Sequence, residues 1–172
     1  MKKLIAILLV LVMAFAMAAC TPTETPENPG NQGENKEPVQ DSFSFTYQGT
    51  KIALHAPAAP IIEALGGNPK YSESTSCAFD GLDKSYGYGS FYLETYPIGD
   101  KDYVYGWYFV DDMVENDEGI CIGSSKADVE AAYGAENYNG SNAFTVRKGS
   151  GMLTVILEND VVSSIQYVIV TE

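Results

Sequence analysis

The sequence predicts an α+β domain in residues 42–172, made of two tandem repeats of a helix followed by an antiparallel meander. The first supporting observation is an internal similarity, in which residues 52–66 match residues 120–134 at a constant offset of 68. The second is that each half, about 42–112 and 113–172, combines one helix signal with several alternating apolar runs. Helices of two to three turns are unstable alone. We therefore expect both to pack on one shared sheet and to cover one of its faces.

The second-half helix has the clearer signals. Ser125 is a suitable N-cap, Asp128 lies three residues later in a capping-box arrangement, and Gly134 suits the C′ position. In the first half, Pro60 suits the first helical position and Gly66 ends the helix early.

The predicted strands rest on alternation and on the turn residues between runs, such as Gly49 and Asn159-Asp160. Alternating or β-prone residues occupy 43–47, 50–54, 74–79, 90–96, 103–110, 142–147, 152–158 and 161–170.

The first twenty residues have the pattern of an export signal. Lys2 and Lys3 precede an uncharged run that is too short for an ordinary membrane-spanning helix. The run ends in Met17-Ala18-Ala19-Cys20, which resembles the lipobox of bacterial lipoproteins. The resemblance implies cleavage before Cys20 and lipid attachment there, hence a protein anchored to the cell membrane on its extracytoplasmic face. The alternative is an ordinary secretory signal with an incidental cysteine.

Residues 21–41 predict a disordered tether. They contain four prolines and four glutamates, no aromatic residue, and Val39 as the only aliphatic side chain. Such a segment buries too little apolar surface to offset the entropy lost on ordering, so we expect an extended spacer.

Composition narrows the possible functions. The 172 residues include 23 acidic and 10 basic side chains, and the net charge of −13 becomes −15 if Lys2 and Lys3 are removed with the signal. Nucleic-acid binding requires clustered lysine and arginine, so we expect no nucleic-acid partner. One histidine and three cysteines also leave little for a Cys/His metal site, and we expect no metal or cofactor.

Two segments carry a resemblance to known proteins. Residues 111–134, which include Gly119-Ile120-Cys121-Ile122-Gly123, and residues 77–86, beginning Cys77-Ala78-Phe79-Asp80-Gly81, resemble elements of small lipoproteins from Gram-positive anaerobes. More distantly, the helix units resemble tandem-repeat β-lactamase-inhibitor-like domains. The resemblance implies a lipoprotein repeat domain with a protein-binding role, and it transfers no catalytic residue because its motifs are turns and caps.

His55 is the only imidazole and therefore the only histidine available as a general base. The sequence has no Gly-x-Ser-x-Gly motif that would present a nucleophile. We expect His55 to lie in a turn, and we assign no catalytic residue.

Cys77 and Cys121 remain after lipidation of Cys20. An exported domain with two cysteines is compatible with a disulfide between them, but two buried thiols are equally consistent with the sequence.

The acidic residues of the 111–118 segment suggest an alternative function, an extracellular small-ligand or Ca²⁺-binding site. Their spacing does not match a calcium-binding loop, and a solvated connector between the halves explains them as well.

Tyrosine is the most prominent candidate for a binding surface. A sheet covered on one face exposes alternate side chains on the other, and tyrosine contributes large contact area at low entropic cost. The sequence thus suggests a non-enzymatic binding or inhibitor-like module that docks a protein, peptide or envelope polymer. Alternatively, the tyrosines merely fill a half-wet sheet. The candidate contact residues are Tyr86, Tyr88, Tyr96, Tyr105 and Tyr108.

Overall fold

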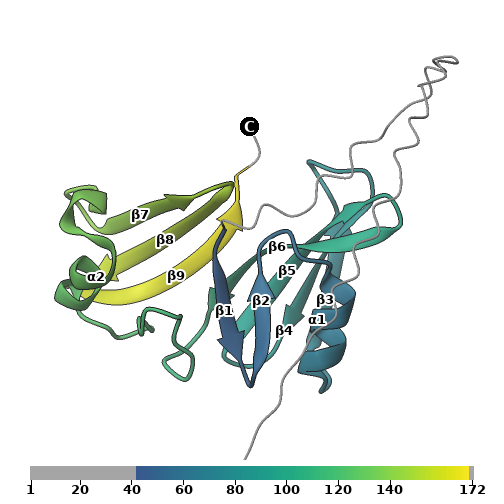
Figure 1. Cartoon of the computed structure of the whole chain (residues 1–172), viewed down its shortest axis with the longest axis horizontal. Coiled ribbons are helices and arrows are strands. Elements are labelled where there is room, and N and C mark those ends of the chain that lie inside the picture. The colour runs from purple at the N-terminus through teal and green to yellow at the C-terminus, as the bar shows by residue number, and fades with distance from the viewer. Residues whose placement is uncertain (1–41, 171–172) are drawn as a thin grey trace, which may run out of the picture. The chain divides into compact units, whose positions relative to one another are not determined.

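The computed structural model describes residues 42–170 (Figure 1). The predicted signal, the lipid-attachment residue Cys20 and the predicted tether lie outside these residues. In chain order the elements are β1 (Ser44–Tyr47), β2 (Thr50–Ala53), α1 (Ala58–Leu65), β3 (Lys70–Thr75), β4 (Leu82–Gly87), β5 (Phe91–Ile98), β6 (Lys101–Phe109), α2 (Lys126–Tyr133), the 3₁₀ turn η1 (Ala135–Asn137), β7 (Ala143–Lys148), β8 (Gly151–Glu158) and β9 (Val161–Ile169).

Seven strands form one antiparallel sheet in the order β3-β4-β5-β6-β9-β8-β7, and β1 and β2 form a separate hairpin (Figure 1). With two short helices beside antiparallel strands, the α+β class is confirmed. Strands β3 to β6 form one meander and β7 to β9 form a second, and the two meet where β6 pairs with β9.

Most strands fall where alternation placed them, but the predicted strand at 74–79 is wrong. β3 ends at Thr75, a loop follows, and β4 begins at Leu82. The missed strand β4 contains the polar run Asp83-Lys84-Ser85, which gives no alternation signal. Pairing with β3 on one side and β5 on the other holds it extended.

The capping box at α2 is confirmed, since the Ser125 hydroxyl accepts from the Asp128 N–H and the Asp128 carboxylate accepts from the Ser125 N–H. For α1, the predicted start at Pro60 is wrong, because the helix begins at Ala58 after Pro57. Pro60 still lies in the first turn, where backbone N–H groups have no helical partner, so its missing N–H costs no helical hydrogen bond.

The contact between the two meanders is short. Only Gly106, Trp107 and Tyr108 of β6 pair with β9, opposite Val168, Tyr167 and Gln166. The Trp107 and Tyr167 rings stack with centroids 4.9 Å apart. A Cβ on Gly106 would lie 2.2 Å from the Tyr167 carbonyl oxygen, so this close approach requires glycine.

One face of the sheet is covered by the hairpin, the helices and the connecting segments. Phe45 of β1 is fully buried and contacts Phe91, Trp107 and Phe109, while Phe43 packs edge-on against Tyr167. The hairpin therefore spans the β6–β9 contact and joins the cores of both meanders.

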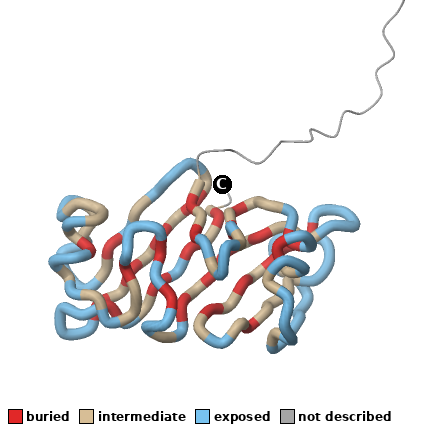
Figure 2. The backbone as a smooth tube through the Cα atoms, turned by 60° about the horizontal axis from the view of Figure 1, so that its bottom comes forward, coloured by how far each residue is buried: buried red, intermediate tan, exposed pale blue. Residues whose placement is uncertain are grey.

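Burial alternates along the strands, as the red and tan segments of Figure 2 show. In β8, Leu153 and Val155 are buried on the covered face, whereas Met152 and Thr154 on the opposite face are only half-buried. We call this opposite side the open face, defined by Ser72, Ser85, Tyr92, Glu94, Tyr108, Thr154 and Gln166.

Candidate functional site

The centre of the open face carries a pair of tyrosines beside the β6–β9 contact. Tyr92 and Tyr108 are cross-strand partners, and their rings stack with centroids 5.1 Å apart and planes inclined by 7°. Both side chains are half-buried, and Gln166 lies opposite Tyr108 on β9. The pair forms a partly exposed aromatic surface of the kind that contacts partners with little loss of side-chain entropy.

The structure separates the five tyrosines proposed from sequence. Tyr108 and Tyr105 lie on the open face, where Tyr105 lines a pocket described below. Tyr96 has the same orientation, but it is only 4% exposed because the Phe79 ring packs 4.5 Å from its own ring. Sequence reasoning did not select Tyr92, the stacking partner of Tyr108.

Tyr86 and Tyr88 belong to the covered side. Tyr86 lies opposite the buried Leu93, and the Tyr88 ring stacks on Phe91 at 5.3 Å. Neither therefore contributes to an open-face contact. The alternation of side chains along β4 would have placed Tyr86 on the opposite face from Tyr108, but β4 was not recognised as a strand in the sequence.

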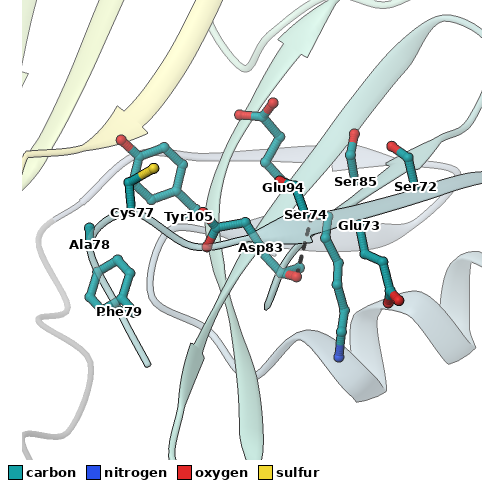
Figure 3. Close-up of a pocket in the computed structure, with 12 residues that line it drawn as sticks. Ser72, Glu73, Ser74, Cys77, Ala78, Phe79, Asp83, Ser85, Glu94 and Tyr105 are labelled. Carbon is teal, nitrogen blue, oxygen red and sulfur yellow. Dashed lines mark hydrogen bonds between the residues drawn. The ribbon is translucent and has the colours of Figure 1, made fainter. Parts of the chain in front are cut away.

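A pocket of about 420 Å³ opens on this face, over β3, β4 and β5 (Figure 3). The strands supply serine hydroxyls and the carboxylates of Glu73, Asp83 and Glu94, while the 77–79 loop and Tyr105 form its apolar side. The strand residues that line it on the open face are Ser72, Ser74, Asp83, Ser85 and Glu94.

The pocket has an excess of negative charge. Its one lysine, Lys84, is paired with Asp102 at 2.6 Å. Within residues 42–170, neither Asp83 nor Glu94 has an ion pair. Burial raises the pKa of the Glu94 carboxyl, and the nearby Asp83 charge raises this pKa further. A bound cation would favour the ionised Glu94 carboxylate and so oppose this rise in pKa.

A second pocket of about 670 Å³ lies between the start of α1 and the β5–β6 turn. It is lined mainly by apolar groups of 57–62, together with Tyr86, Tyr103 and the side chains of 100–102. Because Tyr86 belongs to the covered side, this pocket is not part of the open face.

His55 is hydrogen-bonded to two hydroxyl groups from distant parts of the chain. Its Nδ1 is 2.9 Å from the Tyr96 hydroxyl, and its Nε2 is 2.8 Å from Ser150 Oγ. A serine beside a histidine can act as a nucleophile. Here, among the described residues, a tyrosine rather than a carboxylate orients the imidazole, and neither pocket is lined by His55 or Ser150. His55 therefore links the segment after β2 to the β7–β8 turn through hydrogen bonds, which is a structural role.

The disulfide considered between Cys77 and Cys121 is not formed, since both residues are free thiols. Cys77 is exposed in the β3–β4 loop and lines the open-face pocket, while Cys121 lies before α2 with its Sγ 3.6 Å from Ser124 Oγ.

The 111–118 segment is anchored by its one buried polar residue, Asn116. The Asn116 amide donates to the hydroxyls of Tyr133 and Tyr167 at 2.7 and 2.8 Å. Its carbonyl accepts from the backbone N–H groups of Ile120 and Glu118 at 2.8 and 3.2 Å. Sequence reasoning missed this residue, because a single asparagine in an acidic loop carries no signal of burial.

In the described part of the chain, no three Asp, Glu, His or Cys side chains lie close enough to hold a metal ion. The alternative of a Ca²⁺ site in 111–118 therefore gains no support from the structure. The same residues also contain no helix with the length and apolar character required to cross a membrane.

Comparison of the chain with protein-family models, with curated proteins and with solved structures found no match.

Proposed function

We propose that this protein is a non-enzymatic binding module of the bacterial cell envelope, anchored to the outer side of the cell membrane through a lipid on Cys20. Its open sheet face would dock a protein, peptide or envelope polymer. The anchor rests on the Met17-Ala18-Ala19-Cys20 motif. The docking role rests on the geometry of residues 42–170.

The observation that carries this proposal is the stacked Tyr92–Tyr108 pair on a sheet face that the helices leave uncovered. If the tyrosines only filled a partly solvated sheet face, they would not need to pair with one another. Here two rings stack with nearly parallel planes at the middle of the face, beside the acidic pocket, so aromatic and polar contacts adjoin.

We also propose that the domain is a tandem repeat. Outward from the β6–β9 contact, the strands run β6-β5-β4 on one side and β9-β8-β7 on the other. One helix precedes each set of three, and Trp107 and Tyr167 face each other at the contact. On this interpretation β3 is an insertion in the first repeat, which accounts for the longer connection from its helix to its meander.

Site-specific photocrosslinking in intact cells tests the docking role. A benzoylphenylalanine at position 108 is expected to give a discrete adduct, as is one at Gln166. The matched control is the same group at Glu63, an exposed α1 position outside the open face. Equal adducts at all three positions, or none at 108 and 166, would contradict docking through the open face.

A further inference from the structure

Strand β3 is an unpaired edge beside the open-face pocket. It is the terminal strand of the sheet, and within residues 42–170 it pairs with β4 alone. All six of its residues are exposed. The outer backbone N–H and C=O groups of such a strand can pair with an extended segment of another chain.

A strand added to this edge would reach the pocket with its side chains. Neighbouring strands lie about 4.8 Å apart, so the added strand would lie one spacing from Ser72 and Ser74 and two from Asp83. Alternate residues of the added strand would point to the open face. A lysine or arginine side chain there is long enough to extend over the serines to Asp83, whereas Glu94 on β5 lies three spacings away and adds attraction at longer range.

The charges of the pocket favour a basic residue at that position. Asp83 and Glu94 have no cation opposite them within residues 42–170, because Lys84 is held by Asp102. The Tyr105 and Phe79 rings line the same pocket and suit the planar guanidinium of arginine. Charge and shape thus point to the same type of ligand.

We propose that the β3 edge and the adjoining pocket bind an extended segment of a partner protein that carries arginine or lysine at alternate positions. The added strand supplies affinity through main-chain hydrogen bonds, and the cationic side chain supplies specificity through Asp83 and Glu94. This inference rests on the proposed binding function and names the chemistry of the partner.

The test uses two peptide probes on the ¹⁵N-labelled domain, acetyl-Thr-Arg-Thr-Arg-Thr-amide and its glutamine-for-arginine counterpart. We expect the arginine peptide to bind at least tenfold more tightly, to shift the amide signals of Ser72 and Ser74, and to slow hydrogen exchange along β3. In the double variant Asp83→Asn, Glu94→Gln, the arginine peptide should fall to the affinity of the glutamine peptide.

A matched control separates this site from the general attraction of an acidic protein for cations. The double variant Asp112→Asn, Glu115→Gln removes the same charge from exposed positions outside the pocket and should retain arginine-peptide binding. Equal binding of the two peptides, or equal weakening by the two double variants, would overturn the proposal. So would a concentration-dependent dimer that protects β3, because a second copy would then occupy the edge. Open-face crosslinks without peptide binding would reject this inference and leave the proposed function standing.

Discussion

Replacing Asn116 with alanine is expected to lower the free energy of unfolding by about 2–6 kcal/mol. The substitution removes all four side-chain hydrogen bonds of a residue that is 4% exposed. Water cannot readily reach the Tyr167 hydroxyl or the Ile120 N–H, which are buried with it. Each buried polar group left without its partner costs about 1–3 kcal/mol, so two such groups cost about 2–6 kcal/mol.

Urea denaturation followed by the fluorescence of Trp107, the only tryptophan, measures this loss. With a slope of about 2 kcal/mol per molar urea, the middle of the usual range, the midpoint should fall by about 1–3 M. Asn139→Ala is the matched control, because the Asn139 carbonyl accepts from three backbone N–H groups but is exposed, so water can replace it. We expect that control to cost under about 1 kcal/mol. A loss for Asn116→Ala no larger than for Asn139→Ala would refute the reasoning.

Three further predictions concern the fold. Gly106→Ala should lower the free energy of unfolding by about 1–3 kcal/mol, the usual cost of overpacking, because the new Cβ would meet the Tyr167 carbonyl oxygen. A urea midpoint unchanged from that of the wild type would contradict this. Ser125→Ala should cost about 1 kcal/mol through loss of the α2 cap, measured by the same assay with Ser163→Ala as an exposed control. Burial lowers the pKa of His55 below its usual 6.5, so the unfolded chain binds the proton first and stability should fall as pH drops through 6.5. His55→Gln should remove this dependence of stability on pH. An NMR titration of the single imidazole that gives a pKa above 6.5 would contradict the prediction.

The local elements were largely readable from the sequence because their signals are local. The capping box needs only Ser125 and Asp128, and the β8–β9 turn forms where Asn159 and Asp160 both tolerate a positive φ. Strand β4 was missed because its polar residues are held extended by neighbours on both sides rather than by their own pattern.

The candidate site was only partly predictable. Tyr105 and Tyr108 were among the proposed contact residues, but Tyr86 and Tyr88 lie on the covered side and Tyr96 is buried under Phe79. Side-chain direction in a sheet reverses with each residue, so one missed strand or bulge changes the face. The register shift between Glu94 and Thr95 is such a bulge, and it lies beside Tyr105.

The sequence by itself determined the α+β class, the α2 cap, the hairpin turns and the acidic character of the domain. Each depends on residues close together in the chain or on composition alone. Only the tertiary structure decided which strand lies at the edge, that Tyr92 stacks on Tyr108, and that Asp83 and Glu94 share a pocket without a cation. These features depend on pairing between strands far apart in the chain, and strand order and register follow from the packing of the whole sheet.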